Sequence, residues 1–200
     1  TQMRLALSEA PEIQDPLVVY AKIKNINDSS VELDKQTLDE NLYYVYAKGG
    51  LDSTYTDPAL AIQRADEQTG VVLNSAQQYV WERGNKKTKL ILNLDDIPEA
   101  VKQKFTDTST LQESLGTEGK VMDLSGCTLD SVLYEISAQR PVIAKTGSDT
   151  YVVIIGYDEY NTYLYDPQKD ESYPYGMNDS TELFEKAGNI FISYIENISY

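Results

Sequence analysis

The chain has 200 residues, of which 32 are Asp or Glu and 17 are Lys or Arg, so its formal net charge is -15. Such acidity repels the phosphates of nucleic acids and anionic membrane surfaces, so we expect neither as a partner. One cysteine and no histidine exclude an internal disulfide, a histidine-based catalytic triad and a histidine-ligated metal within this chain. We therefore expect no cofactor.

No apolar run approaches the roughly 20 residues that a membrane-spanning helix requires, so we expect no direct insertion into a membrane. The first residues, TQMRLALSEA, lack the uninterrupted apolar segment of a signal peptide, and we expect the sequence to be cut from a longer parent. The chain holds 16 tyrosines against three phenylalanines, which favours half-exposed aromatic strand faces. That pattern fits ordinary sheet packing as well as a ligand groove.

The first half of the chain predicts a small module of strands around one helix. Strands are expected where β-branched and aromatic residues gather, at 17–26, 42–50, 71–74 and 79–84. A helix is expected within 56–70, because Asp57 can cap it, Pro58 fits its first turn and Gly70 stops it. From residue 42 onward this order is β-α-β-β.

Aromatic residues make the strands of this module candidates for binding. Alternation along 79–84 places Tyr79, Trp81 and Arg83 on one face of their strand. Together with Tyr43 on another strand, they form a face suited to stacking on sugar rings. The alternative is ordinary core packing, which is the more common role of a lone tryptophan.

The stretch from YYVYAKGG to YVWERG resembles the sporulation-related repeat domains, which bind bacterial cell-wall glycan. The resemblance is carried by an aromatic-rich strand, an alanine-rich helix with Ala61 and Ala65 four residues apart, and two further strands. It implies binding of a peptidoglycan fragment. A generic β-α-β-β packing module is the alternative.

The middle of the chain predicts the domain division. A strand is expected at 87–94 and a short helix at 97–105. The next stretch, 106–120, is polar, contains two glycines and lacks an apolar period, so we expect a linker or long loop. This gives an N-terminal α+β module at 1–105 and a C-terminal half at 121–200.

The C-terminal half has the firmest pattern. Apolar residues at helical spacing predict an amphipathic helix, carried by Leu129, Val132, Leu133 and Ile136. Strands are expected at 141–146, 150–157, 162–166 and 188–198. A polar loop at 168–180 precedes a second helix, capped by Asn178 or Asp179. These elements indicate an α+β fold built on an antiparallel sheet, with a close approach or bulge at Gly156 inside its central strand.

Residues 120–196 resemble the papain-like fold of the bacterial double-glycine leader peptidases, which are cysteine peptidases. The matching stretches are RPVIAKTG, TYVVIIGYD and YLYDP, set between two amphipathic helices. In that family the apolar strand opens with the catalytic histidine, and here Thr150 holds that position. The acidic third member of the triad corresponds to Asp166, which precedes a proline. An ordinary turn-forming acid is the alternative for Asp166.

This chain lacks the histidine and the cysteine that the family uses for catalysis. A threonine such as Thr150 cannot accept a proton near neutral pH, so it cannot activate a thiol. Cys127 lies too late in the chain to match the family nucleophile. It fits a small buried hydrophobe, or a thiol activated by the start of the helix near Thr128.

We therefore expect a non-catalytic, degenerate papain-like domain of a secreted or cell-envelope bacterial protein, with an extracellular setting as in Gram-positive bacteria. Its partner would be a peptide or a peptidoglycan fragment, bound beside Thr150, Tyr151 and Asp166. Two alternatives stay open. One is a cysteine peptidase completed by missing parts of its parent or by a partner, and the other is a purely structural assembly domain.

Overall fold

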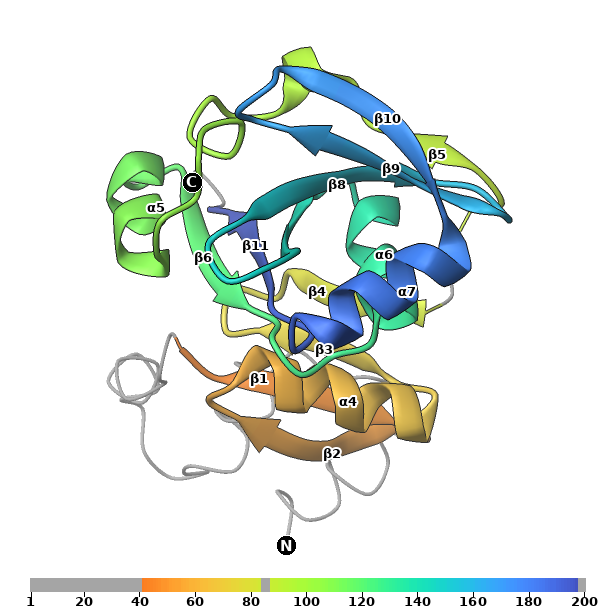
Figure 1. Cartoon of the computed structure of the whole chain (residues 1–200). Helices are drawn as coiled ribbons and strands as arrows, with labels where there is room; N and C mark the ends of the chain where they lie inside the picture. The colour runs from red at the N-terminus through yellow and green to blue at the C-terminus, as the bar shows by residue number, and fades with distance from the viewer. Residues whose placement is uncertain (1–40, 84–86, 198–200) are drawn as a thin grey trace, which may run out of the picture. The chain divides into compact units, whose positions relative to one another are not determined.

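The computed structural model of the chain describes residues 41–83 and 87–197. The chain forms two compact units, Thr1–Arg83 and Gly84–Tyr200 (Figure 1). The strand predicted at 17–26 lies outside the described residues. Both units mix helices with antiparallel sheets, so the predicted α+β class is confirmed.

Within residues 41–83, the first unit is a four-stranded antiparallel sheet in the order β2-β1-β3-β4. Its elements are β1 (Tyr43–Ala47), β2 (Gly50–Tyr55), α4 (Pro58–Gln68), β3 (Val71–Asn74) and β4 (Tyr79–Glu82). Strand β2 is absent from the predicted β-α-β-β order. Lys48 and Gly49 both have positive φ and turn the chain back from β1 into a hairpin.

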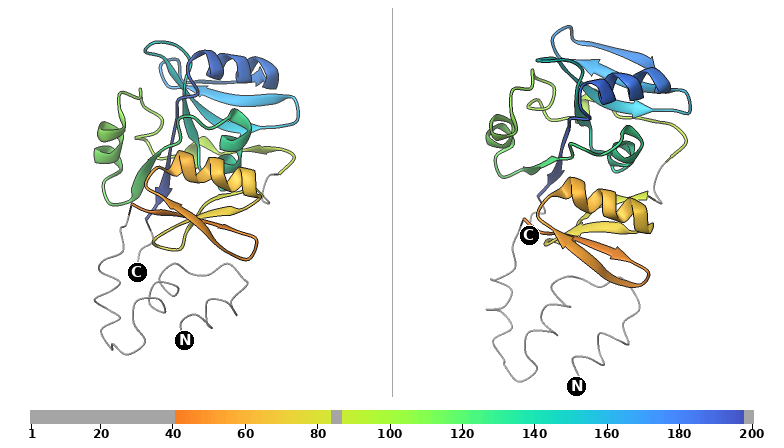
Figure 2. Two further views of the ribbon diagram at one scale, coloured as in Figure 1. Left: turned by 90° about the horizontal axis from the view of Figure 1, so that it is seen from below. Right: turned by 60° about the horizontal axis from the view of Figure 1, so that its bottom comes forward.

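Helix α4 begins where the sequence predicts and packs on one face of this sheet (Figures 1 and 2). The side chain of Asp57 accepts a hydrogen bond from a first-turn N–H at 2.9 Å, and Pro58 opens the helix. Thr69, rather than Gly70, takes the left-handed conformation at its end. Gly70 is required for space, because a Cβ there would collide with the carbonyl oxygen of Tyr46.

Within residues 87–197, the second unit contains a seven-stranded sheet in the order β10-β9-β8-β7-β11-β6, with β5 paired to β8. Every pairing in it is antiparallel. The strands are β5 (Leu90–Ile91), β6 (Gly119–Asp123), β7 (Val142–Lys145), β8 (Tyr151–Tyr157), β9 (Asn161–Asp166), β10 (Glu171–Gly176) and β11 (Phe191–Glu196). The helices are η2 (Leu94–Asp96), α5 (Thr108–Leu115), α6 (Leu129–Ser137) and α7 (Met177–Lys186).

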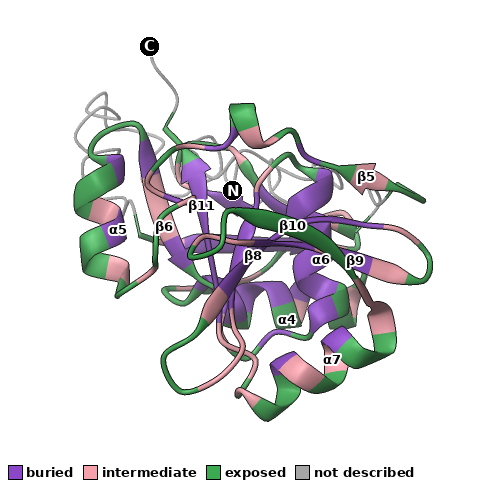
Figure 3. Ribbon diagram, turned by 45° about the horizontal axis from the view of Figure 1, so that its top comes forward, coloured by how far each residue is buried: buried purple, intermediate pink, exposed green. Residues whose placement is uncertain are grey.

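Helices α6 and α7 pack on the same face of this sheet (Figure 1). Tyr157 of β8 and Thr162 of β9 are paired across the strands, so their side chains point to one side. The hydroxyl of Tyr157 hydrogen-bonds Ser137 of α6 at 2.7 Å, and that of Thr162 hydrogen-bonds Ser180 of α7 at 2.7 Å. Figure 3 shows β8 and α6 as largely buried and β10 as exposed.

The division at Arg83 and Gly84 replaces the predicted boundary at 106–120. Strand β5 pairs with β8, so residues from 87 onward belong with the second unit. The predicted linker contains α5, which buries Leu111 and Leu115 and packs on β6. Two apolar side chains one turn apart anchor this helix. Two such residues are too few to show a helical period in the sequence. The stretch 97–105 forms turns instead of the predicted helix.

Strand β10 occupies the stretch that the sequence predicts as a polar loop. It lies at the edge of the sheet and pairs with β9 alone. Pro174 is tolerated there because an edge strand does not need every backbone N–H for pairing. Helix α7 then begins directly after Gly176, without a side-chain cap from Asn178 or Asp179.

The close approach predicted at Gly156 is confirmed. The pairing of β8 with β9 shifts register between Ile154 and Gly156, which marks a bulge. A Cβ at this position would lie 2.6 Å from the carbonyl oxygen of Leu90 and 2.9 Å from the Cα of Ile91. The missing side chain therefore lets β5 reach the edge of β8.

We predict that Gly156→Ala lowers the free energy of unfolding by about 1–3 kcal/mol, because the added methyl group must push β5 away. Gly119→Ala is the matched control in the same unit, since a Cβ there meets its nearest atoms at an ordinary 3.4 Å. Urea denaturation followed by circular dichroism compares the two variants. Equal stability of Gly156→Ala and the unmodified protein would show that β5 does not need this gap.

Because two tyrosines are buried, we predict that the free energy of unfolding falls at high pH. Burial raises the pKa of Tyr43 to about 12, with nearby Asp57 adding to it, and burial likewise raises the pKa of Tyr194 to about 12. An unfolded tyrosine ionises near pH 10, so below that pH both states are neutral and stability is full. Between pH 10 and 12 the unfolded chain loses its protons first, and stability falls.

We therefore expect alkaline unfolding within this window, measured by circular dichroism beside the absorbance of tyrosinate. Tyr43→Phe and Tyr194→Phe should each move the midpoint to higher pH. Tyr79→Phe is the control and should leave the midpoint in place, because Tyr79 is exposed. Ionisation of every tyrosine near pH 10 with the fold intact would contradict this expectation.

Candidate functional site

Thr150 and Asp166 line one pocket of about 430 Å³ in the second unit. Thr150 directly precedes β8 and Asp166 ends β9. These strands are antiparallel neighbours, so the start of one lies beside the end of the other. The sequence analysis predicts this juxtaposition, and we call this site the Thr150–Asp166 pocket.

The walls of the pocket come from three adjacent strands and one helix. Leu164 of β9 is paired with Ile154 of β8 and with Tyr173 of β10, so the side chains at these positions share the face that carries α7. Alternation puts Tyr175 on the same face as Tyr173. The other lining residues are Thr146, Tyr151, Val152, Gln168, Lys169 and Leu183.

Hydroxyl and carboxylate groups meet at this pocket. The Thr146 hydroxyl donates to the Thr150 hydroxyl at 2.8 Å, and the Thr146 N–H donates to the Thr150 carbonyl oxygen at 2.8 Å. Asp166 accepts a hydrogen bond from the Gln168 N–H through Oδ1 at 2.9 Å. Asp166 thus forms the turn that its position before proline predicts, and it also lines the pocket.

Two tyrosines of β10 add an aromatic wall. Tyr173 is 37% exposed, and Tyr175 is half-buried. The pKa of Tyr173 is raised, first by partial burial and then by the negative charge of Asp166 and by Tyr175. Lys169 brings a positive charge to the same rim. The pocket therefore combines aromatic faces, hydroxyls and both signs of charge.

Tyr151 belongs to the pocket through its place at the start of β8. Its ring contacts Phe105 edge-on, with 4.8 Å between the ring centres. Alternation along β8 directs this ring to the face opposite Val152. Tyr151 thus fixes the strand beside Thr150 more than it offers an aromatic surface to the pocket.

The pocket lacks the parts of a thiol-based catalytic site. Cys127 is 1% exposed and is not among the residues that line it. The sequence contains no histidine that could act as a base. The hydroxyl of Thr146 is hydrogen-bonded to that of Thr150 at 2.8 Å. What this arrangement offers a ligand is hydrogen bonds, charge and aromatic contact.

The aromatic face predicted in the first unit is not formed as expected. A register shift in the pairing of β3 with β4 puts Tyr79 opposite Leu73 but Trp81 opposite Val72, which point to opposite faces. Trp81 is 1% exposed, whereas Tyr79 is 53% exposed. Alternation therefore fails within β4.

The other two candidates of the first unit are also engaged within the fold. Tyr43 is buried, so it has no face for a sugar ring. Arg83 makes an ion pair with Asp66 of α4, with 2.7 Å between Nη1 and Oδ1. Among these four residues, Tyr79 is the one whose ring stands open to solvent.

The tyrosines of β10 are the site residues that sequence reasoning misses. They lie in a stretch taken as a loop because it is polar and contains proline and glycine. The sequence signal that finds them is the spacing in SYPYG, where Tyr173 and Tyr175 alternate as on a strand face.

Within residues 41–83 and 87–197, no group of three or more Cys, Asp or Glu side chains is arranged to hold a metal ion. No helix in these same ranges is long and apolar enough to cross a bilayer.

Among solved structures, the chain is similar to a protein described as a C39-like peptidase from Bacillus anthracis. The TM-score is 0.38 and the sequence identity is 20%. The match covers 46% of this chain and 58% of that chain, so this chain spans less than two thirds of that structure. No family model and no curated protein matches the sequence.

Proposed function

We propose that the second unit is a non-catalytic, peptidase-like domain that binds a peptide in the Thr150–Asp166 pocket. The observation that carries this proposal is that Thr150 and Asp166, from the ends of two strands, line one pocket with an aromatic wall. The sequence resemblance assigns these two positions to a former catalytic base and its acidic partner. A threonine in place of the base removes cleavage and leaves a concave surface.

The chemistry of the pocket suits a peptide with a positive charge. A volume of about 430 Å³ lies in the range of ligand sites and accommodates one or two side chains. Asp166 uses Oδ1 in its turn, which leaves Oδ2 for a ligand N–H or ammonium. The formal net charge of -15 attracts cations at long range, and salt weakens that attraction.

The setting that we propose is secreted or at the cell envelope, with a peptidoglycan-derived peptide as the ligand. Its support is the sequence resemblance of the two halves of the chain, one to leader peptidases and the other to cell-wall binding repeats. The exposed ring of Tyr79 is the surviving candidate contact for glycan in the first unit.

The protein should not cleave peptides. With casein or a double-glycine leader peptide as substrate, we expect no hydrolysis that iodoacetamide abolishes, because the pocket lacks a thiol and a base. Cys127→Ala is the control for any trace activity. Thiol-sensitive cleavage that vanishes in this variant would favour a cysteine peptidase completed by other parts of its parent.

Binding should depend on the charge of Asp166. We expect a lysine-containing cell-wall peptide to bind about fivefold more weakly to Asp166→Asn, which keeps the acceptor for the Gln168 N–H and removes the charge. Isothermal titration at low and high salt measures this, and high salt should weaken binding further. Asp96→Asn is the matched control, since Asp96 is exposed and lies outside the pocket.

Equal affinities for the unmodified protein and Asp166→Asn, with no effect of salt, would contradict a role for this pocket. The structural assembly domain would then be the better interpretation of the second unit.

A further inference from the structure

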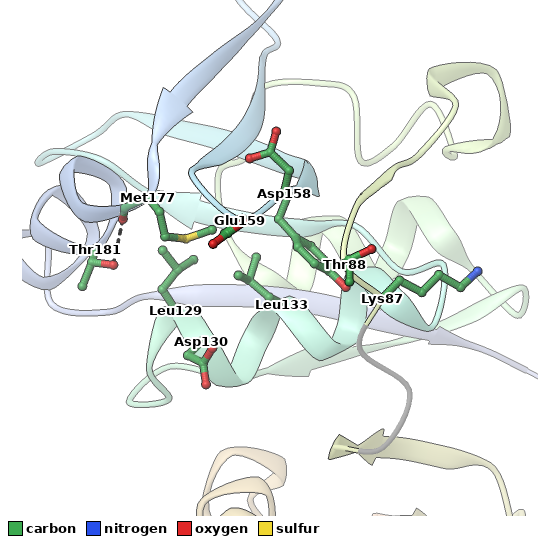
Figure 4. A pocket seen from close by; sticks show the side chains of 10 residues that line it. Lys87, Thr88, Leu129, Asp130, Leu133, Asp158, Glu159, Met177 and Thr181 are labelled. Atoms are coloured by element: carbon green, nitrogen blue, oxygen red, sulfur yellow. Dashed lines mark hydrogen bonds between the residues drawn. The ribbon is translucent and has the colours of Figure 1, made fainter.

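A second pocket of about 480 Å³ lies against the other side of α7 (Figure 4). Four segments of the second unit build it: the stretch before β5, the first turns of α6, the end of β8, and the start of α7. Its lining residues are Lys87, Thr88, Leu129, Asp130, Leu133, Tyr157, Asp158, Glu159, Met177 and Thr181. We call it the α6–α7 pocket.

The centre of the α6–α7 pocket is apolar. Leu129 and Leu133 lie one turn apart on α6, and Figure 4 shows them beside the thioether of Met177. Tyr157 adds its ring, and its hydroxyl is turned to Ser137 in a 2.7 Å hydrogen bond. Methionine adapts its shape to different apolar partners, so this floor suits a side chain of leucine or phenylalanine size.

The rim of the α6–α7 pocket is negative. It carries Asp130, Asp158 and Glu159. In Figure 4 the Glu159 carboxylate lies beside the apolar centre, whereas the carboxylates of Asp130 and Asp158 and the ammonium group of Lys87 extend away from it. Asp158 is a rigid anion, because its carboxylate accepts hydrogen bonds from the Tyr163 hydroxyl and from two backbone N–H groups, all within 2.9 Å. The hydroxyl of Tyr163 contributes most to holding the pKa of Asp158 below its usual value.

The positive ends of the two helices do not cancel this charge. In α6, Thr128 accepts a hydrogen bond from the Ser131 N–H, and Asp130 adds an acid in the first turn. In α7, the first N–H, that of Met177, donates to the carbonyl oxygen of Tyr160 at 2.7 Å. The helix starts are thus partly neutralised by the protein itself, and an anionic ligand would meet the Glu159 carboxylate beside the apolar centre, with Asp130 and Asp158 further out.

We propose that the α6–α7 pocket is a second ligand site, which takes an apolar side chain of a peptide whose flanking residues are lysine or arginine. The apolar residue lies against Met177 and over the buried floor of Leu129 and Leu133, and a flanking cation lies near Glu159. This site goes beyond the proposed function, because it lies outside the Thr150–Asp166 pocket and shares no lining residue with it.

The test uses three capped tripeptides as probes: leucine between two lysines, leucine between two glutamates, and alanine between two lysines. Methyl NMR on the full chain distinguishes the sites, since Leu129, Leu133 and Met177 report on this pocket and Leu164 and Leu183 on the other. We expect saturable shifts of the first three methyl groups with Lys-Leu-Lys. Both other peptides should bind at least about fivefold more weakly.

Two variants test the two parts of the proposed recognition, the charge at the rim and the space of the pocket. Glu159→Gln should weaken binding of the Lys-Leu-Lys peptide about twofold to fivefold, as for an exposed charge at a rim. Glu185→Gln on the exposed surface of α7 is the matched control and should have no effect. Thr181→Trp should fill the pocket and abolish the shifts at Leu129 and Leu133, with circular dichroism confirming the fold.

Asp166→Asn should leave the response of Leu129, Leu133 and Met177 unchanged, which separates this proposal from the proposed function. The proposal is overturned if Glu-Leu-Glu binds as tightly as Lys-Leu-Lys, or if no saturable shift occurs at these methyl groups. It is equally overturned if Thr181→Trp binds the peptide at the same site with the same affinity.

Discussion

The second unit depends on the backbone pairing of β8, which engages three strands. Along one edge its first four residues pair with β7, and its last two pair with β5, while β9 occupies the other edge. This arrangement requires Gly156, because a side chain there would fill the space that β5 occupies. The same strand carries a pocket at each end: Thr150 precedes the strand at one end, and at the other Tyr157 ends it and Asp158 follows it. The main-chain pairing of this strand therefore fixes one wall of each site.

Helix α7 separates the two pockets and is held by a polar contact in an apolar setting. Ser180 and Phe184 are fully buried, and the Ser180 hydroxyl shares a 2.7 Å hydrogen bond with Thr162. Buried hydroxyls are costly unless satisfied. The hydroxyl that accepts in this pair can donate its own hydrogen to the carbonyl oxygen of Tyr175, which lies 3.3 Å from the Thr162 hydroxyl and 3.4 Å from that of Ser180. This side of α7 is therefore fixed to the sheet. Met177 and Leu183 then project to different sides, where each lines one pocket.

Elements with strong local signals were predictable from the sequence. Helix α4 has its cap at Asp57, α6 has a continuous apolar period, and the buried run of β8 is unambiguous. Strands β2 and β10 were not predictable, because they are exposed and their residues resemble those of loops. The side of the sheet on which Trp81 lies was not predictable either, because a β-bulge reverses it. Of the candidate site, the Thr150–Asp166 pair followed from family resemblance and strand order. The α6–α7 pocket could not follow, because four segments far apart in the sequence each contribute two or three residues that form no common motif.

We expect that a histidine introduced at position 150 would not create a cysteine-peptidase site. The Thr150 hydroxyl is paired with that of Thr146, so an imidazole at this position would first have to displace a hydrogen bond within the β7–β8 turn. It would then face Asp166, whose Oδ1 is already committed to the Gln168 N–H. Even with a base and an acid to orient it, the site would have no nucleophile. Cys127 is buried just before α6 and lines neither pocket. Cys127 and the Thr150–Asp166 pocket thus lie in separate parts of the unit, and β8, β9 and β10 together line the concave surface of that pocket. Such a surface is maintained by the strand pairing itself, and it can serve binding without any of the residues that cleavage requires.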